Sequence, residues 1–304
     1  MTTYVLKRLL QVPVPLLVVS LVVFFALRLT GDPVELLLGL EATAEERATL
    51  REKLGLNAPI IVQYGRFLLH AATGDFGDSL RFKEPALRLV LGHLPNTLAL
   101  AAVGLVLASI LGVTFGVLAA VRRGSTFDLS LVSLGVLGQS VPSFWLGILL
   151  IMLFAVQLRW LPTSGTGDWR HLVLPGLTLA SFILPQVTLL TRSSMFDVLN
   201  ENYIAVARAK GLGSITVTLH ALKNAVHPVI AYLGLQTGTL VGGSIITETI
   251  FSWPGVGQLT IQSIFTRDVV VVEAAVLVMA LAIVLSNLLA YIINAGLDPR
   301  IRIS

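Results

Sequence analysis

Residues 201–229 read ENYIAVARAKGLGSITVTLHALKNAVHPV, and this stretch decides how the chain is organised. It is polar and basic, yet it lies between two apolar runs, 172–191 and 229–251, that are each long enough to cross a bilayer as a helix. A chain that only turned back into the membrane would need a few residues here. The stretch instead predicts two short helices around a glycine-containing break at residues 211–213, and therefore a loop built to dock into another protein.

The second of these predicted helices carries an apolar stripe. Four apolar residues recur at i, i+4, i+7 and i+11, which places them on one helical face: Ile215, Leu219, Leu222 and Val226. Ser214 is the predicted N-cap, because its hydroxyl can accept a hydrogen bond from a free backbone N–H of the first turn.

The composition indicates a membrane protein. Hydrophobic residues make up 55% of the 304 residues and charged residues 12%, and the mean hydropathy is +0.86. Soluble domains carry roughly a quarter charged residues, so most of this chain must face lipid or other buried helices. Six apolar runs are long enough to span a bilayer: 9–29, 98–121, 129–158, 172–191, 229–251 and 269–293. We therefore predict an all-α polytopic membrane protein with six transmembrane helices.

The basic residues indicate the orientation of the predicted spans. The basic residues near the chain ends and in the loops after the second and fourth spans lie on one side: Lys7, Arg8, Arg122, Arg123, Arg192, Arg208, Lys210, Lys223, Arg300 and Arg302. The short loops on the other side hold only Arg159, Arg170 and Arg267. The positive-inside rule therefore places both termini in the cytoplasm. Because the basic residues form no stripe, the sequence pI near 9.6 does not indicate nucleic-acid binding.

The predicted spans divide the chain into three parts. Residues 1–29 form an N-terminal anchor helix that has no small-residue cleavage site behind it. Residues 30–96 form an extracytoplasmic helical segment, too small to be an independent domain. Residues 97–304 form a five-helix core that contains the cytoplasmic loop 192–228.

Local signals predict the helices of the extracytoplasmic segment. Thr43 and Glu46 match a capping box, which opens a helix that runs through Leu54. A second helix is expected over 60–70, after a proline. A third short helix, over 85–94, is expected to lead back to the membrane.

Polar residues interrupt two of the predicted spans. In the third span, Gln139 and Ser140 precede Pro142, and a proline inside a span kinks the helix and frees a carbonyl that neighbours or water must satisfy. A packing kink and a lining of the transport pathway both fit this pattern. Gln186 in the fourth span is a further candidate for the pathway.

Glycines recur in the fifth predicted span. Gly234, Gly238 and Gly242 are spaced four residues apart, which creates a face of small residues where another helix can approach closely. Helix packing is favoured over a pore-lining role for these three positions.

The chain lacks the residues for several chemistries. It has no Gly-Lys dipeptide and therefore no GxxxxGK[ST] phosphate loop, so we predict that it is not an enzyme that hydrolyses ATP. It has no cysteine, and His220 and His227 fit solvated helix histidines better than metal ligands. The ionisable residues Arg28, Glu248 and Glu273 fall near the outer ends of the spans, which disfavours a self-contained secondary carrier or channel.

Motifs along the chain resemble one family. YIAVARAKGLG at 203–213, followed by HALKNA at 220–225, resembles the cytoplasmic "EAA" loop of ABC importer permeases. Six further motifs are similar to the dipeptide, oligopeptide and nickel branch, in the subunit with the longer outer segment: LGL at 54–56, GDFGDS at 74–79, VPSFWLG at 141–147, WLPTSG at 160–165, ETIFSWPGVG at 248–257 and DPRIR at 298–302. One departure is Ala205, which occupies the position of the loop's signature acidic residue, while Gly211 is kept.

The resemblance implies the permease subunit of an ATP-driven, binding-protein-dependent importer of type I architecture in the cell inner membrane. Di- or oligopeptides are the favoured substrates, and nickel or another small solute of the same family remains the alternative. The implied partners are a second homologous permease subunit, two ATP-binding subunits, an extracytoplasmic substrate-binding protein and membrane lipid, and no nucleic acid. No cofactor or metal is expected on this chain, since ATP and Mg would bind to the partner subunits.

The resemblance also implies that the loop is a coupling element, in which an amphipathic helix lies in a groove of the ATP-binding subunit. The residues expected to contact this subunit are those of the loop's break and of the following helix: Ala205, Arg208, Lys210, Gly211, Leu212, Gly213, Ser214, Ile215 and Leu219.

Overall fold

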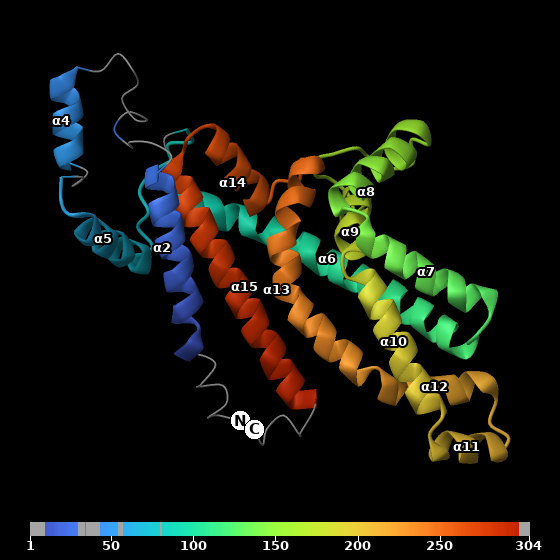
Figure 1. Cartoon of the computed structure of the whole chain (residues 1–304). Helices are drawn as coiled ribbons and strands as arrows, with labels where there is room; N and C mark the ends of the chain where they lie inside the picture. The colour runs from blue at the N-terminus through green and yellow to red at the C-terminus, as the bar shows by residue number, and fades with distance from the viewer. Residues whose placement is uncertain (1–9, 30–33, 35–42, 54–56, 80, 298–304) are drawn as a thin grey trace.

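The computed structural model of the chain describes residues 10–29, 34, 43–53, 57–79 and 81–297 (Figure 1). Within these ranges the regular elements are all helices, so the predicted all-α fold is confirmed.

The described helices are named by their place along the chain. In chain order they are α2 (Pro13–Leu29), α4 (Ala44–Lys53), α5 (Ile60–Thr73), α6 (Ala86–Val121), α7 (Thr126–Ser140), α8 (Ser143–Leu150), the π-helical segment η1 (Ile151–Gln157), α9 (Arg170–Ser181), α10 (Leu184–Leu199), α11 (Asn202–Ala209), α12 (Ser214–Ala225), α13 (His227–Ile250), α14 (Val256–Phe265) and α15 (Val269–Leu297).

Three helices of the described residues are long and apolar enough to cross a membrane, namely α6, α13 and α15. The pair α9 and α10 meets the same criterion when its two helices, bent by 60°, are taken as one span. The apolar helix α2 has 17 residues and is shorter than these. The structure therefore supports a multi-pass protein, while the count of six spans stays a prediction.

The kink expected at Pro142 in the predicted span 129–158 is a complete break, so this span is not one continuous helix. Helix α7 ends at Ser140, Val141 is extended, and Pro142 caps the start of α8. A proline lacks the N–H that would continue the ladder and pushes the preceding residue out of the helical region.

A separate short helix over 85–94 is also wrong. This segment and the second predicted span form one continuous helix, α6, with Pro95 inside it. Here the proline removes one N–H from the helical ladder without ending the helix.

A row of small residues along α6 gives the closest helix contacts. The row repeats every four residues and consists of Gly104, Ala108, Gly112, Gly116 and Ala120. A Cβ atom placed on Gly112 would lie 2.5 Å from the Cγ1 atom of Val187, so the side chains of α10 rest on the backbone of α6. The sequence analysis missed this row, although its spacing was visible in the sequence.

The motif at 248–257 forms a tight elbow between α13 and α14. The carboxylate of Glu248 is fully buried and accepts hydrogen bonds from the Ser244 hydroxyl (3.0 Å) and from the backbone N–H of Gln258 (3.1 Å). The indole N–H of Trp253 donates to the carbonyl oxygen of Asn96 (3.0 Å), which fastens the elbow to α6. The buried charge is thus hydrogen-bonded within the elbow, as burial requires.

The capping box at α4 is confirmed. The backbone N–H of Thr43 donates to Glu46 Oε2 (2.9 Å), and the N–H of Glu46 donates to the Thr43 hydroxyl oxygen (3.3 Å). These hydrogen bonds hold the pKa of the exposed Glu46 carboxyl below its usual value.

Candidate functional site

Helices α11 and α12 form a helical hairpin, residues 202–225, at one end of the molecule, below the ends of α6 and α10 (Figure 1). The two short helices predicted from the sequence are confirmed. The loop between the long helices is shorter than the expected 192–228, because α10 continues to Leu199.

The turn of the hairpin depends on Gly211. This residue has φ +79°, in the left-handed region that glycine enters without a side-chain clash. Its N–H donates to the carbonyl oxygen of Arg208 (2.9 Å), and the N–H of Leu212 donates to that of Ala207 (3.2 Å). This pair of bonds is the Schellman arrangement that ends a helix at a glycine, and the predicted reversal at Gly211 is confirmed.

The predicted N-cap at Ser214 is wrong. Gly213 is the residue that precedes α12, with an extended backbone and no side-chain cap, and Ser214 is the first residue of the helix. Glycine is tolerated at this position because it can adopt the extended conformation that an N-cap requires.

One side of the hairpin is built into the body of the protein. Three residues of α12 spaced four apart, Val217, Ala221 and Ala225, are buried together with Ile204 of α11. They form one cluster with Ala120 at the end of α6 and with Met195 of α10. The hairpin is therefore packed rigidly on the ends of two long helices.

The other side of the hairpin exposes large apolar residues. Ile215 is 76% exposed, Leu219 61% and Leu212 43%. Leu222 and Val226 are partly buried, so the predicted four-residue stripe is divided between the surface and the interior. The exposed members are those that the sequence analysis assigned to partner contact.

Basic residues flank the turn. Arg208 and Lys210 are exposed, and Arg208 lines a cavity of about 410 Å³ between the hairpin and the ends of α6 and α10. The guanidinium group of Arg123 lines the same cavity and lies 3.4 Å from the ring centroid of Phe196. Ala205, at the expected acidic position, is an exposed residue of α11.

An ion pair fixes α10 to the start of α7 beside the hairpin. Arg192 donates from Nε to Asp128 Oδ1 (2.6 Å) and from its terminal nitrogen to Asp128 Oδ2 (2.8 Å). Asp128 is buried, and the backbone N–H of Gly124 also donates to it (3.0 Å). Bidentate pairs of this kind add orientation as well as energy. The sequence analysis had no signal for this pair, whose members are 64 residues apart.

A cavity between α7 and α10 is lined by sequence neighbours of the predicted pathway residues, and not by those of them whose side chains the structure describes. Val141 of the helix break and Pro185 of α10 line the same cavity of about 280 Å³. Ser140 and Gln186 are exposed residues next to these two positions. The side chain of Gln139 lies outside the part of the chain that the structure describes.

The three glycines of α13 face α15. A Cβ atom placed on Gly234 would lie 3.2 Å from the Cβ atom of Ala290, and one on Gly238 would lie 2.6 Å from Asn287 Oδ1. On Gly242 the nearest atom would be the Cδ1 atom of Ile283, at 3.4 Å. This geometry favours close helix packing as their role.

Each of the two loop histidines lies within hydrogen-bond distance of a nearby backbone carbonyl. A ring nitrogen of His220 lies 2.8 Å from the carbonyl oxygen of Thr216, and one of His227 lies 3.0 Å from that of Asn224. Within the described ranges, no group of three His, Asp or Glu side chains is placed to hold a metal ion.

Two family models match the chain. The model described as "binding-protein-dependent transport system inner membrane component" matches residues 112–303. The model of the N-terminal part of such membrane components matches residues 1–101. The first match includes the hairpin and every helix after α6.

Curated relatives are similar over the whole length. The glutathione transport system permease protein GsiC of Salmonella paratyphi A is 42% identical over an alignment of 304 positions, which covers 99% of each chain. The proteins of the same name from Salmonella typhimurium and Escherichia coli are 42% and 41% identical over the same share of each chain.

A solved structure has a similar fold. A chain in the inward-facing MetNI methionine ABC transporter superposes with a TM-score of 0.54 and is 18% identical. The match covers 69% of this chain and 96% of that chain.

Proposed function

Because the chain belongs to the inner membrane components of binding-protein-dependent ABC importers, in the peptide and nickel branch, we propose that the α11–α12 hairpin couples its helices to separate ATP-binding subunits. The chain is the permease subunit of an ATP-driven importer. It is not an enzyme, because ATP hydrolysis in such importers resides in other subunits.

The observation that carries this proposal is the two-sided hairpin. Leu212, Ile215 and Leu219 are exposed to solvent in the isolated chain. Large apolar side chains grouped on a surface in this way mark a site where a partner binds. Val217 and Ala221, on the opposite side of α12, are buried against the ends of α6 and α10. An amphipathic helix that presents apolar residues in this way fits a hydrophobic groove of a partner.

The mechanism follows from this arrangement. When the ATP-binding subunits bind ATP with Mg and close, the hairpin moves with the groove that holds it. Because the hairpin is packed on α6 and α10, its movement shifts these helices as rigid bodies and changes the side of the membrane to which the pathway opens. Arg208 and Lys210, at the edge of the contact, would pair with acidic groups of the partner.

The complete importer would contain a second homologous permease subunit, two ATP-binding subunits and an external substrate-binding protein. The exposed residues Ser140 and Gln186, beside the cavity between α7 and α10, would contribute to the pathway between the two permease subunits. Peptide-sized solutes are the proposed substrates, and glutathione is the specific candidate because the GsiC relatives share this chain's full length. Nickel or another small solute is the alternative.

Replacing Ile215 with aspartate is expected to weaken the association with the ATP-binding subunits by about tenfold or more. Burying an isoleucine side chain contributes about 1.5–3 kcal/mol to binding, and the change puts a charge at the position that would enter the groove. It leaves α12 intact, because an acidic residue in the first turn of a helix is favourable. The measurement is the amount of ATP-binding subunit that co-purifies with the tagged permease.

The matched control for this change is Phe265→Asp. Phe265 is 84% exposed and lies in α14, at the end of the molecule opposite the hairpin (Figure 1). Co-purification should be normal in this variant. If Ile215→Asp retains its ATP-binding subunits as well as Phe265→Asp does, the hairpin is not the coupling surface.

The proposed orientation places both termini and the hairpin in the cytoplasm and α4 outside. Because the chain has no cysteine, Glu45→Cys in α4 and Lys223→Cys in α12 provide single labelling sites, and both positions are exposed. In intact cells, a membrane-impermeant thiol reagent should label the first variant and spare the second. If only Lys223→Cys is labelled, the orientation is the reverse of the proposed one.

A further inference from the structure

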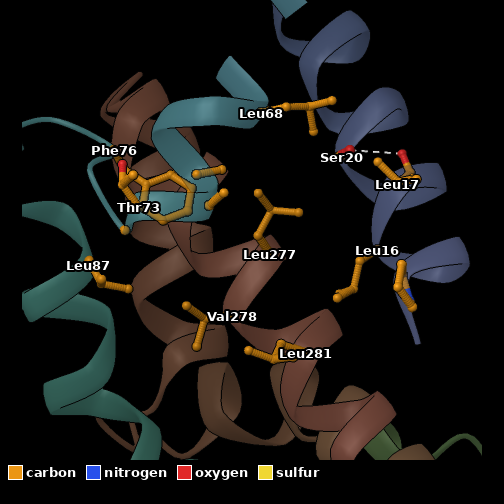
Figure 2. A pocket seen from close by; sticks show the side chains of 14 residues that line it. Leu16, Leu17, Ser20, Leu68, Thr73, Phe76, Leu87, Leu277, Val278 and Leu281 are labelled. Atoms are coloured by element: carbon orange, nitrogen blue, oxygen red, sulfur yellow. Dashed lines mark hydrogen bonds between the residues drawn. The ribbon is translucent and has the colours of Figure 1, made fainter. Parts of the chain in front are cut away.

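A large apolar cavity lies away from the hairpin, between the anchor helix and the core. It has a volume of about 580 Å³, is open on one side, and is lined by α2, α5, α15 and the start of α6. Figure 2 shows Leu16 of α2 and Leu68 of α5 pointing toward the space beside Leu277 of α15. A cavity of this size is within the range of about 300–1,000 Å³ that holds small ligands.

The lining of the cavity is mostly apolar. Of the side chains that line it, those of Ser20 and Thr73 carry the hydroxyl groups. The Ser20 hydroxyl donates to the carbonyl oxygen of Leu17 (2.8 Å) and lies 2.9 Å from the Tyr64 hydroxyl. The Thr73 hydroxyl donates to the carbonyl oxygen of His70 (2.9 Å). Both hydroxyl protons are thus already used within the protein, and the lining favours an apolar ligand over a polar one.

The lining residues of α15 lie in the first half of this helix. Leu277 and Leu281 are eight and twelve residues beyond the start of α15 at Val269, which corresponds to roughly 12 and 18 Å along the helix axis. Both distances are shorter than the thickness of the hydrocarbon core, which is about 30 Å. On α2, the lining residues Leu16 and Leu17 lie in the N-terminal half of the helix.

Helix α5 packs against α2. Its Tyr64 reaches the Ser20 hydroxyl, and the rings of Tyr64 and Phe67 pack on Phe24, with centroids 5.2 and 5.5 Å away. Away from these contacts α5 exposes both apolar residues, Ile61 (77%) and Leu69 (69%), and polar ones, Arg66 and His70. An amphipathic helix of this kind suits the membrane interface.

The rim of the cavity continues into apolar helix surfaces. Leu17 and Leu21 of α2 are 49% and 46% exposed, and Leu281 and Leu285 of α15 are 40% and 49% exposed. Because α15 is long and apolar enough to cross the membrane, the apolar rim lies on a helix that lipid chains can contact. A lipid chain can therefore enter the cavity from the side without crossing a polar surface.

We propose that this cavity binds one acyl chain of a membrane phospholipid, held between α2, α5 and α15. The chain fills apolar volume that would otherwise leave the lining side chains without contacts. It would fasten the anchor helix and α5 to the core. This inference rests on the membrane location of the family and is independent of the hairpin's role.

Photochemical labelling tests the proposal directly. The complete importer is reconstituted in lipid discs that contain phosphatidylcholine with a diazirine in the middle of one acyl chain, irradiated and digested. Adducts are expected in the peptides that contain Leu68 and Leu277, at a yield several-fold above that at Val106 and Ile110 of α6. These two residues, 53% and 60% exposed, report ordinary surrounding lipid.

Two variants separate a bound chain from surrounding lipid. Ala71→Trp adds an indole inside the cavity and should reduce the adducts at Leu277 several-fold, whereas Leu69→Trp, on the outer side of α5, should leave them unchanged. If Ala71→Trp does not accumulate in the membrane, Leu16→Trp fills the same space from α2.

Three results would overturn the proposal. In the first, adducts at Leu277 do not exceed those at Ile110. In the second, both tryptophan variants of α5 give the same yield as the unmodified chain. In the third, the lining residues cross-link to the second permease subunit in place of lipid, which would make the cavity a protein interface.

Discussion

Replacing Gly211 with valine is expected to abolish transport while the protein accumulates in the membrane at normal abundance. Gly211 has φ +79°, and a β-branched residue in that conformation costs about 1–3 kcal/mol. The turn would relieve this cost by opening, and would lose the hydrogen bonds from the N–H groups of Gly211 and Leu212. Leu212 and Ile215 would then leave the positions in which they meet the groove of the ATP-binding subunit.

The measurement for this variant is ATP hydrolysis by the reconstituted importer with and without loaded binding protein. Stimulation by the binding protein should fall at least about tenfold, since each 1.4 kcal/mol of lost contact corresponds to a factor of ten. Membrane insertion should be normal, because no atom outside the turn lies within 4 Å of a Cβ atom at Gly211.

Gly213→Ala is the matched control in the same turn. Gly213 has φ −62° and nothing within 4 Å of a Cβ atom, so alanine fits there without strain. Stimulated hydrolysis should be retained in this variant. Retention of stimulated hydrolysis in Gly211→Val as well would mean that the conformation of the turn does not matter for coupling.

Replacing Gly116 with leucine is expected to reduce the membrane abundance of the chain severely. A Cβ atom at this position would lie 2.5 Å from the Cβ atom of Thr191 and 2.7 Å from the backbone oxygen of Thr188. A backbone oxygen cannot rotate away, so α6 and α10 would have to separate along their contact. Overpacking costs about 1–3 kcal/mol where side chains can adjust, and a clash with backbone should exceed that range.

The abundance of this variant is measured by quantitative blotting of membranes and by its melting temperature in detergent. The control is Gly92→Leu in the same helix, where nothing lies within 4 Å of a Cβ atom. Normal abundance is expected for the control. Equal abundance and melting temperature for the two variants would show that α6 and α10 do not depend on close contact.

Features set by neighbouring residues could be predicted from the sequence. The capping box of Thr43 and Glu46 and the reversal at Gly211 each depend on a few positions along the chain. Their hydrogen bonds join residues within five positions of one another, so the sequence alone contains what determines them.

Features set by the surroundings could not be predicted in this way. Pro142 ends a helix, whereas Pro95 lies inside one, although both follow apolar segments. The difference depends on which neighbours surround each proline. The ion pair of Asp128 and Arg192 joins residues 64 positions apart, and no local pattern marks such a pair.

The candidate site was predicted in part. The exposed Ile215 and Leu219 match the expected partner surface, but Leu222, from the same stripe, is partly buried. A helical stripe shows which residues share a face and does not show how wide the contact with the body of the protein is. That width depends on the angle at which α12 lies on α6 and α10.

The uninterrupted course of α6 has a mechanical consequence. From Asn96, which bonds to the elbow between α13 and α14, to Ala120, which packs with the hairpin, the helix extends roughly 36 Å. This length exceeds the hydrocarbon thickness of about 30 Å, so one stiff element joins the two faces of the membrane. If the hairpin is displaced as proposed, α6 is a single helix that joins it directly to the elbow between α13 and α14.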